Sequence, residues 1–271
     1  MSGNDVVAVL GAGVMGETLL AGLLRSGRQV DSLVVSERRP ERADQLRDKY
    51  GVQVLENGAA AAAASTVVLV VKPQDMAGVL DEIRDTLRPG ALVVSLAAGI
   101  TTAFVEQRLA EGTPVVRVMP NTPALVDEGM SAISPGAHCD QTHLAQAESL
   151  LLSCGRVVRL VEHHLDAVTA VSGSGPAYIF YVVEAMIEAG VLLGLPRTTS
   201  TELVVQTLYG AATMLRETGE HPTVLREQVS SPAGTTIAAL RQLDDHRVRA
   251  AFLTAMEAAR DRSRELASGQ G

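Results

Sequence analysis

Short apolar runs alternate with amphipathic stretches between Val6 and Leu160. Runs rich in β-branched residues predict strands over Val6–Leu10, Leu33–Ser36, Thr66–Val71, Ala91–Leu96, Val115–Met119 and Arg156–Leu160. Apolar positions at helical spacing predict helices between them, over Val14–Arg25, Pro40–Tyr50, Asp75–Leu87, Thr101–Leu109 and Gln141–Leu152. Runs that are apolar throughout favour strands buried on both faces. The alternation therefore predicts a doubly wound α/β domain with a parallel sheet.

The strand pattern stops near His164, and helical periodicity dominates from Asp166 onward. We therefore predict two domains, an α/β domain over residues 1–163 and an all-helical domain over residues 164–271. The longest apolar stretch, Pro176–Leu195, contains Glu184 and Glu188, whose charges would be costly within a bilayer. This stretch predicts a helix buried in a soluble protein or a dimer, and no membrane association.

The charge, aromatic and cysteine content of the chain limits which partners it can bind and where it is located. Lys and Arg number 23 against 31 Asp and Glu, a net charge of -8, with three Phe, four Tyr and no Trp. Such a chain offers neither a basic face nor stacking platforms for nucleic acid. Cys139 and Cys154 are too few for a disulfide framework, and residues 1–5 lack the basic start of a secretory signal. The expected location is cytoplasmic. The histidines and cysteines show no zinc-ligand spacing, so no metal site is expected.

The segment Gly11-Ala12-Gly13-Val14-Met15-Gly16 follows the first predicted strand and opens the first predicted helix. In this context the pattern is typical of a dinucleotide-binding turn. Gly11 permits the tight turn, Gly13 lets the backbone approach a pyrophosphate, and Gly16 lets the helix pack closely on the strand. The alternative is an ordinary glycine-rich turn in an α/β protein.

The end of the second predicted strand bears on the choice of dinucleotide. Glu37 favours the ribose 2′-hydroxyl of NAD, whereas Ser36, Arg38 and Arg39 favour the 2′-phosphate of NADP. We predict NADP(H) as the preferred cofactor, with NAD(H) possible as well. The alternative is that the arginines only open the next helix or pair with Glu41.

Ligands of open α/β sheets bind at the carboxyl ends of the strands. Three later predicted strands end in polar or small residues that could line such a cleft: Lys72-Pro73, Ala97-Ala98-Gly99 and Pro120-Asn121.

The segment Ser230–Thr236 interrupts the helical half of the chain. Ser231 followed by Pro232 predicts a helix N-cap and first helical residue, with the helix continuing over Thr235–Leu240. A helix N-terminus surrounded by small hydroxyl residues is suited to a carboxylate, because free N–H groups converge there. Ordinary helix capping is the alternative explanation.

Four further segments resemble pyrroline-5-carboxylate reductase: Val118–Leu125, Asp166–Tyr178, Leu203–Gly210 and Ser231–Ile237. With the glycine motif, the resemblance covers nearly the whole chain. It implies an N-terminal Rossmann domain and a helical domain that interlocks with a second subunit, giving a homodimer that in this family often assembles further, commonly into decamers. Ala233 departs from the family, which more often has Gly there.

The resemblance also implies an activity and a set of site residues. The activity is the last step of proline biosynthesis, hydride transfer from NAD(P)H to the C=N carbon of 1-pyrroline-5-carboxylate to form L-proline. Ser231, Gly234, Thr235 and Thr236 would hold the substrate, with the Thr236 hydroxyl on the ring nitrogen as the catalytic contact. The cofactor residues it implies are Gly11–Gly16, Ser36, Asn57, Val70, Lys72, Pro73 and Ala97–Gly99.

Two other functions fit parts of the sequence. Related β-hydroxyacid or imine reductases share the two-domain plan but place a catalytic Lys in the helical domain, and Asp166–Leu215 contains no Lys. A nucleotide-binding redox sensor or scaffold without turnover would need the glycine motif but not the segment Ser231–Thr236.

Overall fold

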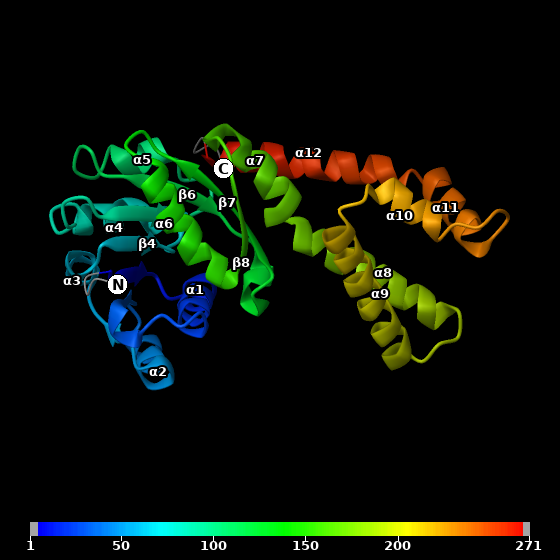
Figure 1. Ribbon diagram of the computed structural model, residues 1–271, viewed down its shortest axis with the longest axis horizontal. Coiled ribbons are helices and arrows are strands. Elements are labelled where there is room, and N and C mark those ends of the chain that lie inside the picture. Colours follow the sequence, from blue (N-terminus) through cyan, green and yellow to red (C-terminus); the bar gives the residue numbers. More distant parts are fainter. Residues whose placement is uncertain (1–4, 268–271) are drawn as a thin grey trace. The chain divides into compact units, whose positions relative to one another are not determined.

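The computed structural model describes residues 5–267 and divides them into two compact units (Figure 1). The first unit comprises the chain up to Ser174 together with the stretch from Ala259 onward, and the second comprises Gly175–Ala258. The units share most, but not all, of their residues with the two predicted domains.

The first unit is built on one sheet whose strands run in the order β3-β2-β1-β4-β5-β6-β7-β8. All neighbouring strands are parallel except β6 and β7, which are antiparallel. The strands are β1 (Val7–Leu10), β2 (Leu33–Ser36), β3 (Gln53–Val54), β4 (Thr66–Leu69), β5 (Leu92–Ser95), β6 (Val115–Met119), β7 (Gly129–Pro135) and β8 (Gly155–Arg159). Strands β2 and β3 are added on one side of β1 and strands β4 to β6 on the other, so the strand order reverses between β1 and β4, which is where open α/β sheets bind their ligands.

Helices cover both faces of this sheet (Figure 1). They are α1 (Val14–Arg25), α2 (Pro40–Tyr50), α3 (Asn57–Ala63), α4 (Met76–Ile83), α5 (Thr102–Glu106), α6 (Gln141–Leu151) and α7 (Leu165–Val168). Short 3₁₀ turns lie at η1 (Val30–Ser32), η2 (Pro73–Asp75), η3 (Thr122–Val126), η4 (Leu152–Cys154) and η5 (Glu162–His164), and a π-helical turn at η6 (Thr169–Gly173). The predicted doubly wound fold is confirmed.

Two apolar cores follow from the alternation of side chains along each buried strand. Val7 and Val9 of β1 point to one face, where they pack with residues of α1, α2 and α6 such as Leu20, Leu46 and Leu144. Ala8 and Leu10 point to the other face, which residues of α3, α4 and α5 cover. These side chains are almost fully buried, so the sheet is a rigid support for the loops at its carboxyl edge.

The strands β2 and β6 and the helices α1 and α2 match their predicted bounds, and the other predicted elements differ by a few residues at their ends. Two strands were not predicted. β3 has only two residues, and β7 reads Gly-Met-Ser-Ala-Ile-Ser-Pro, with no run of β-branched residues. β7 is buried because it pairs with strands on both sides, a tertiary effect that its own residues do not signal.

The second unit contains helices only. They are α8 (Gly175–Leu192), α9 (Arg197–Thr218), α10 (Pro222–Gln228), α11 (Thr235–Asp245) and the first part of α12 (Val248–Ala267). The last residues of α12 belong to the first unit, where the Ser263 hydroxyl donates to the Asp166 carboxylate at 2.8 Å. α8 was predicted to be buried in a soluble protein or in a dimer. In the single chain it has no buried residue, and Phe180 and Leu192 are 67% and 88% exposed.

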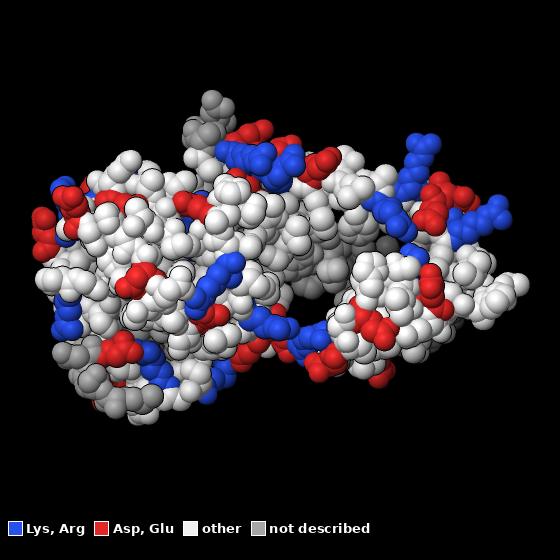
Figure 2. Space-filling model, turned by 45° about the horizontal axis from the view of Figure 1, so that its top comes forward, with Lys and Arg blue, Asp and Glu red and all other residues white. Residues whose placement is uncertain are grey.

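The continuous helical segment Glu162–Leu192 is long and apolar enough to cross a membrane by length and composition alone, which is weak evidence for a span. Exposed apolar helices of this kind also mark protein interfaces. Figure 2 shows acidic and basic side chains interspersed with uncharged ones over the visible face.

Candidate functional site

The turn after β1 has the geometry that a pyrophosphate requires. Gly11 adopts a φ of +95°, and its N–H donates to the Ser36 carbonyl at 3.0 Å. A Cβ on Gly16 would collide with the Gly11 carbonyl oxygen, so this glycine lets α1 begin directly against the turn. Gly13 caps α1 at a φ of -68°, and a Cβ built there would meet no atom within 4 Å. Gly13 is therefore not needed for packing, and its missing side chain leaves open space in front of the N-terminus of α1.

A cavity of about 600 Å³ opens beside this turn, at the switch point between β1 and β4. It brings together eight of the predicted cofactor residues: Gly11, Gly13, Ser36, Arg38, Arg39, Asn57, Val70 and Lys72. These residues come from four loops that are far apart in the sequence and that meet because the strands before them are parallel neighbours. The cleft also includes Gln74, Asp75 and Val79, which the sequence reasoning missed because no local motif marks them.

The charges at the β2 end of the cleft are paired. Glu37 accepts from Nε and Nη2 of Arg39, both at 3.0 Å, and from the Arg39 backbone N–H. The hydrogen bonds from the Arg39 side chain, opposed by burial, hold the pKa of Glu37 below its usual value.

Arg38 is paired differently, because it donates to Glu82 of α4 at 2.8 Å. The second oxygen of Glu82 accepts from the amide of the buried Asn57 at 2.6 Å. Glu82 is another residue that the sequence reasoning missed, and it lies 44 positions from Arg38.

The glycine turn itself is braced from α2. Arg42 donates to the Ala12 carbonyl at 3.3 Å and forms an ion pair with Glu17 of α1, which also accepts from Lys49 and Tyr50. Burial raises the pKa of Glu17, but the hydrogen bonds from Lys49, Arg42 and Tyr50 outweigh it and lower that pKa to about 2.

A second cavity of the first unit, about 810 Å³, is lined by Pro73, Ala98 and Gly99. Gln74 lines both cavities, so they are adjacent along the carboxyl edge of the sheet. The Arg108 guanidinium stacks over the Phe104 ring in its wall, 3.7 Å from the ring centre. Together the two cavities reach from the end of β2 to the end of β5.

Six predicted cofactor residues line neither of these two cavities. Ala12, Gly16 and Ala97 are buried, Val14 lies 71% exposed on α1, and Met15 is partly buried against the core. Asn121 is the sixth, and both ends of its amide are used locally: it donates to the Ser172 carbonyl at 3.1 Å and accepts from the Met130 N–H at 2.8 Å. This geometry ties the end of β6 to the start of β7.

The residues of the cleft fit a nicotinamide dinucleotide. The open space at Gly13 and the free N–H groups that begin α1 suit a pyrophosphate. Arg38, Arg39 and Lys72 supply positive charge at the carboxyl edge, and two of them can exchange a carboxylate partner for a phosphate.

In the second unit, the predicted cap at Ser231 is wrong. α11 begins at Thr235 with Gly234 as its N-cap, and Ser231–Gly234 form a turn in which the Gly234 N–H donates to the Ser231 carbonyl at 3.0 Å. Pro232 is thus in the turn and not at the first helical position. A Cβ on Gly234 would collide with the Ser231 hydroxyl, so this glycine brings Ser231 against the start of the helix.

The corrected start places Thr235 and Thr236 in the first turn of α11, where the backbone N–H groups have no helical partner. Ala233 has a φ of +57°, in the left-handed region that favours glycine. The turn before α11 therefore has a left-handed residue that is alanine, although alanine disfavours this conformation.

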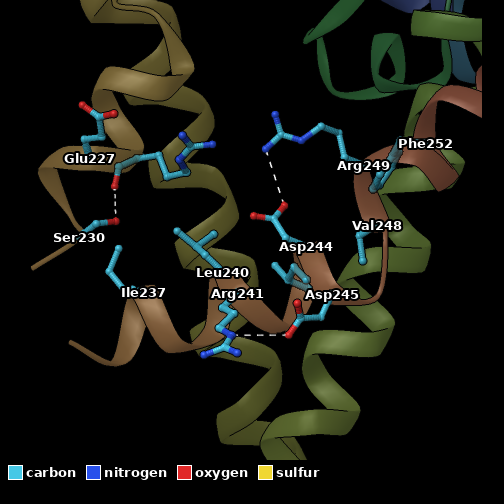
Figure 3. A pocket seen from close by; sticks show the side chains of 12 residues that line it. Glu227, Ser230, Ile237, Leu240, Arg241, Asp244, Asp245, Val248, Arg249 and Phe252 are labelled. Atoms are coloured by element: carbon cyan, nitrogen blue, oxygen red, sulfur yellow. Dashed lines mark hydrogen bonds and ion pairs between the residues drawn. The ribbon is translucent and has the colours of Figure 1, made fainter. Parts of the chain in front are cut away.

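A further hollow of about 620 Å³ lies among α10, α11 and α12 of the second unit (Figure 3). Ile237, Leu240, Val248 and Phe252 give it an apolar lining, while Arg249 pairs with Asp244 and Arg241 with Asp245. Ser230 lines the hollow, but Ser231, Gly234, Thr235 and Thr236 do not. The hollow and the predicted substrate turn are distinct features.

Among residues 5–267, no group of three or more His, Cys, Asp or Glu side chains could hold a metal ion. Cys139 and Cys154 are both free, and burial raises the pKa of each thiol.

Comparison with known proteins covers nearly the whole chain. Residues 162–266 match the family model described as pyrroline-5-carboxylate reductase dimerisation, and residues 6–99 match the model described as NADP oxidoreductase, coenzyme F420-dependent. The pyrroline-5-carboxylate reductase of Corynebacterium melassecola is 48% identical, over 96% of this chain and 98% of that protein. The Pseudomonas aeruginosa reductase is 41% identical, over 98% of each chain.

Solved structures agree with this. A pyrroline-5-carboxylate reductase from Coxiella burnetii superposes with a TM-score of 0.93 at 36% identity, over 97% of this chain and 98% of that one. The Plasmodium falciparum pyrroline carboxylate reductase, solved with NADP bound, gives a TM-score of 0.87 at 28% identity over the same shares. Since the similarity runs through both the sheet and the helices at up to 48% identity, the chain belongs to the pyrroline-5-carboxylate reductase family.

Proposed function

We propose that this protein reduces 1-pyrroline-5-carboxylate to L-proline with a nicotinamide dinucleotide as hydride donor. The observation that carries the proposal is the open space at Gly13, in a cleft at the switch point of the sheet, in a chain of this family. The bound cofactor supplies the hydride. The residues of the protein bind the cofactor and the substrate, orient them and polarise the C=N bond.

We propose NADP(H) as the preferred cofactor. Arg38 and Arg39 at the end of β2 are the positive charges that a 2′-phosphate needs, and Ser36 adds a hydroxyl. Glu37 is already satisfied by Arg39, which leaves its oxygens less available to a ribose hydroxyl. NADH would still bind through the shared pyrophosphate turn. The family model that matches residues 6–99 is described as an NADP oxidoreductase.

We assign the substrate carboxylate to the turn before α11. The free N–H groups at Thr235 and Thr236, together with the Ser231 hydroxyl, form a cradle of donors that a carboxylate accepts from. The Thr236 hydroxyl contacts the ring nitrogen. An imine, especially when protonated, already accepts hydride readily, so positioning and a hydrogen bond at nitrogen suffice without a strong acid or a metal.

We propose that residues 1–163 form the dinucleotide-binding domain and residues 164–271 the substrate-binding and dimerisation domain. The exposed apolar side chains of α8 and the hollow of Figure 3 would be covered by a second copy of the chain. We also propose that the dimers assemble further, into a decamer, and that the protein is cytoplasmic.

One assay tests both the activity and the preference for NADPH over NADH. Oxidation of NADPH, followed at its absorbance band, should depend on added pyrroline-5-carboxylate, and NADH should give a lower kcat/KM. Nucleotide binding without turnover would instead favour a redox sensor or scaffold.

The substrate turn has its own test. Thr236→Ala should lower kcat at least tenfold while leaving the Kd of NADPH unchanged, because one hydrogen bond to a charged group contributes about 1.5–3 kcal/mol. Wild-type turnover in this variant would remove Thr236 from the mechanism.

A further inference from the structure

A buried polar cluster lies beside the loop that follows β5. Arg117 of β6 is only 8% exposed, and the strand register places it between Ser95 of β5 and Ser134 of β7. Both serine hydroxyls are buried and have no hydrogen-bond partner. Arginine is rarely buried without a carboxylate partner, and here the partner comes from outside the sheet.

That partner is Glu162, the first residue of η5 after β8. One of its oxygens accepts from Arg117 at 3.1 Å and from the backbone N–H of Thr102 at 2.8 Å. The other oxygen accepts from the Thr102 hydroxyl at 2.7 Å. Glu162 therefore joins a buried arginine in the sheet to the first residue of α5 with both carboxylate oxygens.

Thr102 ends the loop that carries Ala97, Ala98 and Gly99. Gly99 adopts a φ of +75°, and Thr101 caps α5 by accepting from the Phe104 N–H. The loop is thus fixed at one side by the end of β5 and at the other by Glu162. Its residues Ala98 to Thr101 line the cavity of about 810 Å³ at the edge of the sheet.

We propose that Glu162 is a positioning residue for hydride transfer, which acts by holding the loop Ala97–Thr101 against the nicotinamide end of the cofactor. This inference rests on the proposed function. With the 2′-phosphate at Arg38 and Arg39 in the cavity at the end of β2, the reactive end of the cofactor would lie in the adjoining cavity that this loop lines. The pyrophosphate turn and the 2′-phosphate residues lie on other loops, whereas the three hydrogen bonds that Glu162 accepts come from Thr102 and Arg117. Glu162 therefore governs the rate of the bound complex and not the affinity for the cofactor.

The test uses the full-length protein and the variant Glu162→Gln, which keeps the size of the side chain and removes the charge that pairs with Arg117. A matched control is Glu148→Gln. Glu148 of α6 has the same side-chain exposure of 28% and pairs with Arg159 on β8, but it contacts no residue of the loop. Glu162→Gln should lose more stability in thermal unfolding, because its partner Arg117 is buried whereas the side chain of Arg159 is 38% exposed, so the comparison of the two variants rests on kcat.

The two variants should separate in kinetics. Glu162→Gln is expected to lower kcat about tenfold while the Kd of NADPH changes less than twofold, since misplacement of reacting groups by fractions of an ångström reduces rate strongly. Glu148→Gln should keep the wild-type kcat. Thr102→Ala, which removes only the hydroxyl contact, should lower kcat by about twofold to threefold. Glu162→Asp, which keeps the negative charge, should lower kcat less than Glu162→Gln does.

Each outcome has one meaning. A wild-type kcat in Glu162→Gln, or an equal loss in Glu148→Gln, would overturn the positioning role while leaving the proposed function standing. If the Gln variant does not fold, Thr102→Ala decides, because a wild-type kcat in that variant also overturns the inference. A wild-type protein that binds NADPH but never oxidises it would refute the proposed function, and the positioning role with it.

Discussion

Gly13→Ala separates the ligand-binding role of the glycine motif from its structural role. The new Cβ would meet no atom of the protein within 4 Å, and the φ of -68° suits alanine. Alanine is a poorer N-cap than glycine by about 0.5–1 kcal/mol, but it also removes about 0.4–1 kcal/mol of unfolded-state entropy. The two effects cancel, so the free energy of unfolding should change by less than about 0.5 kcal/mol.

Cofactor binding should respond very differently. The added methyl occupies the space through which the backbone approaches the pyrophosphate, and a loss of about 1.4 kcal/mol of binding free energy raises the KM for NADPH tenfold. Steady-state kinetics with NADPH, alongside urea unfolding, measure both quantities on the same preparation. An unchanged KM would refute the placement of the pyrophosphate at Gly13.

The matched variant is Gly16→Ala, three positions along the same motif. Its Cβ would collide with the Gly11 carbonyl oxygen, and overpacking of this kind costs about 1–3 kcal/mol. At roughly 2–4 °C per kcal/mol, the midpoint of thermal unfolding should fall by several degrees. Equal stability of the two variants would contradict the packing argument.

Three further results are expected. Ala233→Gly should stabilise the protein by about 0.5–1 kcal/mol, because relief of the left-handed φ of +57° exceeds the entropy cost of glycine; a lower urea midpoint would contradict this. Glu17 has a folded pKa of about 2 against an ordinary 4.5, so its contribution is complete above pH 4.5 and is lost as the pH falls toward 2. Glu17→Gln should remove about 1 kcal/mol at pH 7 and flatten the acid side of a stability profile. Arg38→Ala should raise the KM for NADPH about tenfold and leave that for NADH unchanged, and an equal rise for both would remove Arg38 from 2′-phosphate recognition.

The sequence predicted most of the first unit because its strands are continuous apolar runs and its helices are amphipathic, so local pattern and tertiary environment agree. It failed at β7, whose strand conformation comes from pairing with β6 and β8. It also placed the start of α11 too early, because Ser231-Pro232 satisfies a local capping pattern whereas Ala233 takes a left-handed turn first. The local capping preference of Ser231-Pro232 is thus overridden by the backbone turn at Ala233 that precedes the helix.

The site residues divide in the same manner. The glycine turn, Lys72 and the arginines line one cleft and could be predicted to do so, because each follows a predicted strand at the edge where such sheets bind ligands. Glu82 and Glu162 act across 44 and 60 positions of sequence, toward Arg38 and Thr102 respectively. Nothing local distinguishes either glutamate from a solvated surface residue, so only the folded structure identifies it.

The end of α12 belongs to the same unit as the strands that begin the chain, through contacts such as that of Ser263 with Asp166. The first unit is therefore not a continuous piece of polypeptide. A ribosome must synthesise all of the helical segment before the residues that complete this unit emerge, so the first unit is completed last although its strands are made first. A fragment cut after residue 163 would lack both partners of that contact, and it would also lack Ala259 and Arg262, which line the cavity of about 810 Å³.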